Sequence, residues 1–139
     1  MAFLDDIADY LTSQGHGANS TTTGTSPVNI FRNVIPFSPD TAIALFETGG
    51  LASVHAMASG PGQAVAARPS VQIRIRARSQ DAARTLTDSV FNDMDGFRER
   101  TINGTRYSWM QSIQMPFLLD RDDEDREVFA FNMRVIKDL

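Results

Sequence analysis

The segment Arg68-Pro-Ser-Val-Gln-Ile-Arg-Ile-Arg-Ala-Arg-Ser79 alternates apolar and cationic side chains with a period of two. That period is typical of a β-strand with one buried face and one polar face. The residues predicted to face the core are Val71, Ile73, Ile75 and Ala77, and those predicted to line the opposite face are Gln72, Arg74, Arg76 and Arg78. In an acidic protein, such a row of arginines needs either carboxylates from adjacent strands or a partner outside the chain.

The composition predicts one globular domain over residues 1–139. With 42% hydrophobic and 22% charged residues, the chain can bury one ordinary core. The formal net charge of -4 argues against general nucleic-acid binding, which needs a clustered positive field. The absence of cysteine excludes disulfides, thiolate catalysis and thiolate metal sites.

Segment 1–10 carries acidic residues where a secretory signal would carry basic ones. No run of apolar residues approaches the ~20 that a membrane-spanning helix needs. We therefore expect the protein to be made and used in the cytoplasm of a cell, without a membrane partner.

The spacing of apolar residues predicts a short amphipathic helix over residues 3–11 that ends near Gly15 or Gly17. The polar segment 16–27 has no periodicity and is predicted to be a loop. We expect His16 to be a solvated side chain in that loop, because the sequence suggests no partner for it.

Two short strands are predicted at 28–35 and 41–48, separated by a turn with two prolines, and the second is predicted to end at Thr48-Gly49-Gly50. Segment 49–67 is small and flexible, with Gly60-Pro61-Gly62 at its middle. It is predicted to be a long flexible loop or a loose hairpin, and segments of this kind often contact partners.

The second half predicts a helix followed by strands. Ser79 is the expected N-cap of a helix that Gly96 stops. Strands follow at 97–102 and 107–119, joined by a turn at Asn103-Gly104. One face of the second strand, predicted to lie in the core sheet, comprises Trp109, Gln111, Ile113, Met115 and Phe117.

An acidic turn at 120–125 leads to the final strand, in which Phe129, Phe131, Met133 and Val135 alternate with smaller or polar residues. The element order predicts an α+β fold: a mixed, mainly antiparallel sheet with two helices packed on one face and a long flexible loop. The other face of this sheet is expected to be polar and to carry the arginine row.

No constellation of residues predicts catalysis, a metal or a cofactor. The acidic turn lacks the glycine of a calcium loop at its sixth position, Asp125, and the glutamate at its twelfth, Phe131, so we interpret it as a solvated hairpin tip. His55 has no carboxylate or serine at motif spacing, and Gly60-Pro61-Gly62 lacks the lysine of a phosphate-binding loop. We therefore expect the protein not to be an enzyme.

Three interpretations of the arginine row follow from the residues. It could be a solvated face with local ion pairs, worth ~0–1 kcal/mol each. It could be a subunit interface, where the planar guanidinium is favoured. Nucleic-acid contact is the third, weakened by the absence of aromatic residues between the arginines.

Glu47-Thr-Gly-Gly50, the glycine-rich segment after it and the strand 68–78 with its following helix together resemble tailed-bacteriophage minor capsid or tail terminator proteins. The closing part of the chain extends the resemblance. The matching residues there are Gln114-Met-Pro116, Leu119-Asp120, Arg126 and Phe131-Asn132. The similarity spans about residues 1–137 and rests on the order and spacing of these motifs.

The resemblance implies a structural protein of the virion tail or neck. Such proteins form a homo-hexameric ring on the head-proximal end of the tail tube, stop its polymerisation and present a surface to the head. Partners would be the tail tube protein and the head connector or completion protein, with DNA passing through the ring but no specific nucleic acid bound.

The resemblance also implies roles for two groups of residues. A subunit interface or the ring lumen would involve Arg74, Arg76, Arg78, Asp122, Asp123, Glu124 and Asp125. Contact with the tube or connector would involve Gly49, Gly50, Val54, His55, Met57, Gly60 and Gly62. We expect the arginine row and the acidic turn to meet across the subunit boundary.

Alternatives to a tail terminator remain open from the sequence. A head completion or connector protein on the portal side would share its size and ring geometry. A tail tube subunit is disfavoured because it would stack into long tubes. A small α+β nucleic-acid-binding domain would bind single strands with a steep dependence on salt.

Overall fold

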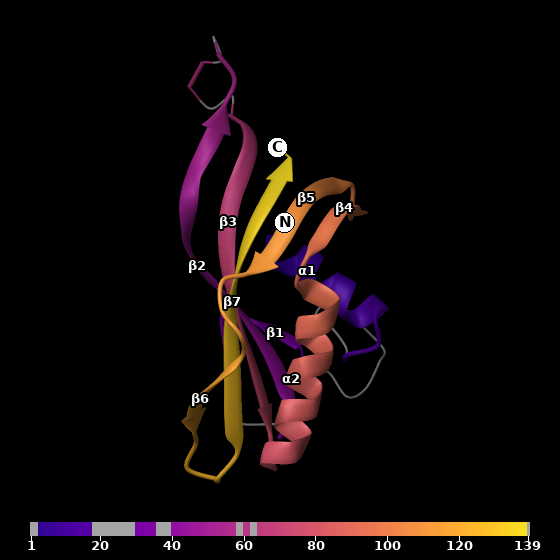
Figure 1. Ribbon diagram of the computed structural model, residues 1–139, viewed down its shortest axis with the longest axis vertical. Coiled ribbons are helices and arrows are strands. Elements are labelled where there is room, and N and C mark those ends of the chain that lie inside the picture. The colour runs from indigo at the N-terminus through magenta and orange to yellow at the C-terminus, as the bar shows by residue number, and fades with distance from the viewer. Residues whose placement is uncertain (1–2, 18–29, 36–39, 58–59, 62–63, 139) are drawn as a thin grey trace.

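The computed structural model describes residues 3–17, 30–35, 40–57, 60–61 and 64–138 (Figure 1). Two helices and a seven-stranded mixed sheet form an α+β fold, which confirms the predicted fold class. The elements are α1 Phe3–Ser13, β1 Ile30–Arg32, β2 Ala42–His55, β3 Ala64–Ala77, α2 Gln80–Met94, β4 Phe97–Ile102, β5 Thr105–Ser112, β6 Phe117–Arg121 and β7 Glu127–Asp138.

The long strand β3 lies at the centre of the sheet, between β2 and β7. The strand order is β1-β2-β3-β7-β5-β4, and β6 pairs with the part of β7 that β5 leaves uncovered. Among the strands of the described residues, β1 and β2 are parallel and the other pairs are antiparallel. β3 therefore takes part in hydrogen-bonded pairing on both sides, with the register Ile73↔Leu45 and Ile73↔Phe131.

The alternation in β3 has the predicted effect. Val71, Ile73 and Ile75 are fully buried. They belong to a single core cluster that contains residues of both helices and of β7, so both helices pack on the same side of the sheet. In this cluster the ring of Phe91 in α2 meets that of Phe131 in β7 edge to face at 5.4 Å.

Both helices begin and end close to the predicted positions. The Ser79 hydroxyl accepts a hydrogen bond from the Ala82 amide at 3.1 Å and caps α2. Gly15 and Gly96 follow the two helices with φ of +85° and +79°, a conformation that favours glycine. No helix in the described ranges is long and apolar enough to cross a membrane.

Strand β5 departs from prediction. The predicted strand 107–119 is wrong, because pairing stops at Ser112 and resumes only in β6, beyond the buried Pro116, which has no amide hydrogen to donate. The strand pairs within the sheet as predicted, but the face that carries Gln111 and Ile113 is not the buried one. A register shift between Tyr107 and Trp109 leaves Tyr107 and Met110 fully buried, whereas Gln111, Ile113 and Met115 are exposed.

Helix α1 is anchored to the sheet by polar contacts. The Tyr107 hydroxyl donates to the buried Asp6 carboxylate, which also accepts from the Asn103 amide at 3.0 Å. Burial, followed by the hydrogen bond to Asp6, raises the pKa of Tyr107 well above its usual value. His16 contacts the Asp93 carboxylate of α2, so the prediction of a solvated histidine is wrong. The rest of the predicted loop, from residue 18 to 27, lies outside the described residues.

The segment predicted as a flexible loop at 49–67 is largely strand. β2 continues through Gly49 and Gly50 to His55, and β3 begins at Ala64, so the hairpin alternative is confirmed. The two strands extend past the rest of the sheet (Figure 1) as a projection that we call the hairpin arm, which comprises the described residues 49–57, 60–61 and 64–67.

Candidate functional site

The side of the sheet away from the helices, which we call the open face, holds the arginine row. Its central residues are Gln72, Arg74 and Arg76 of β3, the neighbouring Ala130, Asn132 and Arg134 of β7, and Phe46 of β2. The face is less polar than predicted, because Trp109 of β5 and its partner Ile136 also lie on it. A hollow lies toward each end of the open face.

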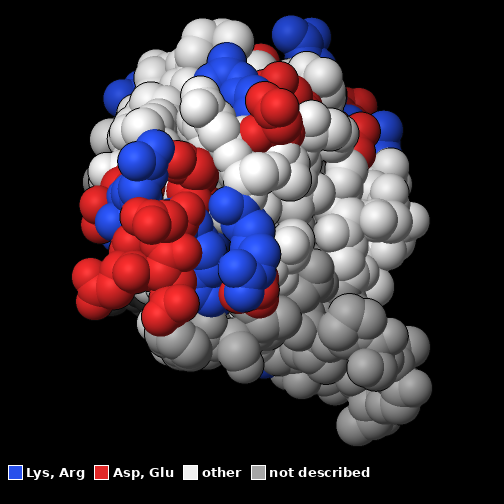
Figure 2. All heavy atoms as spheres, turned by 90° about the horizontal axis from the view of Figure 1, so that it is seen from below, with Lys and Arg blue, Asp and Glu red and all other residues white. Residues whose placement is uncertain are grey.

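The first hollow lies beside the acidic turn. Its cavity of about 600 Å³ is lined by Arg74, Arg76 and Arg126 and by acidic residues of the turn. Figure 2 views the molecule from this end and shows basic and acidic side chains gathered next to each other. The lining acids are Asp120, Asp122, Asp123 and Glu124.

Asp40 and Arg126 connect the two charged groups within one subunit. Asp40 accepts from Arg78 Nε at 2.6 Å and from Arg126 Nη1 at 3.1 Å. The Nε of the nearly buried Arg126 donates to Asp122 at 2.7 Å. The arginine row and the acidic turn thus come together inside one chain, so their contact does not require a neighbour.

The three arginines of the row have different environments. Arg74 stacks over the Phe46 ring at 4.4 Å and donates to Gln72 Oε1 at 2.7 Å. Arg76 is only 4% exposed and donates to the Asp40 carbonyl oxygen at 3.1 Å, and burial lowers its pKa. Arg78 is exposed. The sequence could not separate these three environments, because they depend on residues from other strands.

Two carboxylates of the cluster are held in their charged form. The hydrogen bond from Arg78 is the main reason that the pKa of Asp40 is lowered. Burial alone would raise the pKa of Asp122, but hydrogen bonds from the Arg126 backbone and side chain and from the Glu124 amide outweigh it, and the pKa is lowered.

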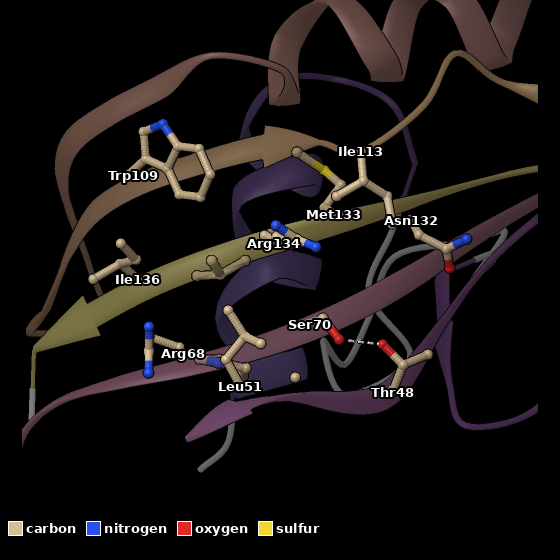
Figure 3. A pocket seen from close by; sticks show the side chains of 13 residues that line it. Thr48, Leu51, Arg68, Ser70, Trp109, Ile113, Asn132, Met133, Arg134 and Ile136 are labelled. Atoms are coloured by element: carbon tan, nitrogen blue, oxygen red, sulfur yellow. Dashed lines mark hydrogen bonds between the residues drawn. The ribbon is translucent and has the colours of Figure 1, made fainter. Parts of the chain in front are cut away.

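The second hollow, which we call the Trp109 groove, lies between β2, β3, β7 and β5 (Figure 3). Its volume is about 410 Å³. The apolar lining includes Leu51, Trp109, Ile113 and Ile136, and the polar lining includes Thr48, Arg68, Ser70, Asn132 and Arg134. The Thr48 and Ser70 hydroxyls are hydrogen-bonded to each other, and Arg68 Nε donates to the Ala52 carbonyl at 2.7 Å.

Two irregularities in strand pairing build the Trp109 groove. The register of β2 on β3 shifts between Thr48↔Ser70 and Leu51↔Arg68, which brings Leu51 to the groove. Gly50 permits this bulge: its φ is +71°, and a Cβ there would lie 2.6 Å from the Arg68 carbonyl oxygen. The sequence did not predict the groove, although the pair Gly49-Gly50 was a signal for the bulge.

Of the residues predicted to contact a tube or connector, those that the structure describes lie on the hairpin arm. Val54, His55 and Met57 are exposed, and Met57 is 99% exposed near the tip. Gly60 lies in the described tip, whereas Gly62 lies outside the described residues. The described residues contain no group of three or more side chains suited to hold a metal ion.

Comparisons with known proteins identify the family. The sequence profile of the bacteriophage tail terminator protein family matches residues 10–139. A chain in the solved virion of a native gene transfer agent particle shares the fold with a TM-score of 0.63 at 12% identity, over 99% of this chain and 96% of that one. No curated protein sequence matches. The chain belongs to the bacteriophage tail terminator family and is a structural protein of the virion tail.

Proposed function

We propose that the chain assembles as a homo-hexameric ring that caps the end of the tail tube, stops its polymerisation and offers a surface to the head. The observation that carries this proposal is the open face. In this structural protein of the virion tail, the helices cover one side of the sheet. The other side carries an apolar groove that is also lined by arginines. Such a surface is typical of a protein interface.

The edge of the sheet supports association between copies. β1 pairs with β2 only from Ile43 to Leu45. Among the described residues no strand covers the outer edge of β2 from Phe46 to His55, and exposed strand edges favour pairing with another chain. We assign the hairpin arm to contact with the tube or the head connector, since the arm projects from the sheet (Figure 1) and the exposed Met57 follows the end of β2 at His55.

The contacts of the arginine row count against a nucleic-acid-binding module. Arg78 and Arg126 are bound to Asp40, and Arg74 stacks on Phe46. These contacts neutralise or occupy guanidinium groups that a phosphate backbone would require. A head completion or connector protein would use similar surfaces. The two functions are therefore distinguished by the binding partner, which is the tail tube for a terminator and the portal for a head completion protein.

The test combines sedimentation with electron microscopy of purified tail tubes. We expect hexamers in solution or on tube ends, rings at one end of each tube, and no further growth of capped tubes. A protein that remains monomeric and ignores tubes contradicts the proposal. Binding to portal assemblies but not to tube ends supports the head completion alternative.

Variants should separate the arm from the open face. Met57→Glu is expected to abolish tube binding and leave the oligomer intact, whereas Met115→Glu, on an exposed site away from the arm, is the matched control. Arg74→Glu is expected to weaken oligomerisation. Arg76 is unsuitable for this test because it is buried, and its reversal would damage the fold.

A further inference from the structure

We infer that the Trp109 groove of one copy receives the acidic turn, Asp120–Asp125, of a second copy. This inference rests on the proposed ring and names the two surfaces that would meet in it. It differs from the sequence-based expectation, in which the turn meets the row of Arg74, Arg76 and Arg78.

The groove is an apolar depression with positive charge. Arg68 and Arg134 line it together with Trp109 and Ile136, and none of its thirteen lining residues is acidic. In the described part of the chain no carboxylate lies within ion-pair distance of the exposed Arg134. The groove therefore favours a ligand that combines an apolar side chain with carboxylates.

The acidic turn and the strand before it have that combination. Asp123 and Glu124 are exposed, and their carboxylates form no ion pair with the described residues, whereas Asp122 pairs with Arg126. Leu118 and Leu119, just before the turn, are 52% and 38% exposed. The hairpin of β6 and β7 thus presents exposed leucines beside unpaired carboxylates.

One chain cannot bring these two surfaces together. The turn joins β6 to β7 and lies just outside the pair Arg121↔Glu127, next to the first residue of β7. Arg134 lies seven residues further along this strand, a separation of roughly 23 Å at ~3.3 Å per residue. Each copy therefore has one groove without an acidic lining residue and one turn in which Asp123 and Glu124 form no ion pair with the described residues.

Two unlike surfaces on one subunit make a head-to-tail contact, which closes into a ring when the rotation per subunit is suitable. A second copy satisfies both requirements, complementary charge and the presence of each surface on every subunit. Such a contact also leaves the outer part of the hairpin arm, from Val54 to Met57, available to another partner.

Cross-linking tests the contact directly, because the chain has no cysteine of its own. The double variant Glu124→Cys with Ile136→Cys, treated with a short bis-maleimide under ring-forming conditions, is expected to give a ladder of covalent oligomers on a denaturing gel. The single variants and the pair Glu124→Cys with Asp88→Cys, which uses an exposed site on α2, are the controls. Equal cross-linking in the double variant and the controls overturns the inference.

A charge exchange gives a second test. Arg134→Glu and Glu124→Arg are each expected to weaken assembly at least about tenfold with unchanged thermal stability, because both side chains are exposed. The two changes in the same chain are expected to restore assembly. Wild-type assembly by both single variants, or no rescue by the pair, overturns the inference.

The outcomes separate this inference from the proposed function. If the wild-type protein forms rings and caps tubes while cross-linking and charge exchange fail, only the pairing of groove and turn is wrong. If the wild-type protein stays monomeric and does not bind tubes, both proposals fall.

Discussion

The two faces of the central strands β3 and β7 differ sharply although their residues alternate along the same backbone. On the helix-covered face Ile73 pairs with Phe131, and both are fully buried. One residue away on the open face, Gln72 pairs with Asn132, and both are partly exposed. The covered face is already satisfied within one chain, whereas the open face keeps surface that only a partner can cover.

The difference also sets what each face contributes. Burial of a large apolar side chain stabilises by ~1.5–3 kcal/mol, whereas an exposed ion pair adds ~0–1 kcal/mol. The covered face should therefore determine stability, and the open face should determine assembly. Four substitutions test this division.

The largest effect is expected on the covered face. Phe131→Ala should lower the free energy of unfolding by about 3–5 kcal/mol, because it removes a fully buried ring that packs on Phe91. Its neighbour on the open face is the control: Asn132→Ala should change stability by less than about 0.5 kcal/mol. Urea unfolding measures both, and similar losses for the two variants would contradict the division.

Polar anchoring of α1 on the covered face should give the next largest effect. Asp6 is buried and accepts hydrogen bonds from the Tyr107 hydroxyl and the Asn103 side-chain amide. Tyr107→Phe removes the first of these two bonds and keeps the second. We expect a loss of about 1–3 kcal/mol at neutral pH. Ser108→Ala, on the adjacent and partly exposed position, should change stability by less than about 0.5 kcal/mol.

The Tyr107→Phe variant should also change how the stability of the protein depends on pH in alkaline solution. Because the folded protein raises the pKa of Tyr107 above 10.0, the unfolded chain loses this proton first, and stability falls as the pH rises above about 10. Tyr107→Phe should flatten that part of the stability curve. The slope of stability against pH is compared between wild type and Tyr107→Phe from about pH 9 to about pH 11, around the pKa of free tyrosine. Equal slopes would show that Tyr107 does not contribute to the loss of stability.

The sequence predicted the covered face better than the open one. The alternation of Val71, Ile73 and Ile75 and the cap Ser79 act through local periodicity and local hydrogen bonds, which a single sequence displays. The open face depends on register. The shift between Tyr107 and Trp109 reverses which side chains are buried, and the Asp40 pairing joins residues 38 and 86 positions apart. Such features follow from strand pairing rather than from local pattern.

The bulge in β2 links the two faces, and its loss should give an effect similar in size to that of Tyr107→Phe. Gly50→Ala should cost about 1–3 kcal/mol, because alanine is strained at φ +71° and its Cβ would lie 2.6 Å from the Arg68 carbonyl oxygen. Gly49→Ala is the matched control, since a Cβ there meets nothing within 4 Å. It should be neutral or slightly stabilising, by up to about 1 kcal/mol.

Gly50→Ala also tests the Trp109 groove. The backbone would shift to relieve the strain at residue 50, and this shift would move the neighbouring Leu51 out of the groove. We expect this variant, but not Gly49→Ala, to lose assembly under conditions in which both are folded. Equal stability of the two variants would show that the bulge does not require glycine.

The smallest effect on stability should come from the open-face carboxylates. Because Asp40 has a folded-state pKa below its usual 3.8, its charged form stabilises the fold above that pH. This contribution is lost as the pH falls below about 3.8 toward the folded-state value. Asp40→Asn should therefore lack this contribution at neutral pH, which lowers stability slightly, and should make the acid limb of the stability curve shallower. Asp88→Asn, which removes an exposed ion pair within α2, is the control and should keep the wild-type limb. If the stability of Asp40→Asn falls more steeply in acid than that of the wild type, the open-face cluster destabilises the monomer. The arginines of this cluster would then depend on a neighbour for their charge balance.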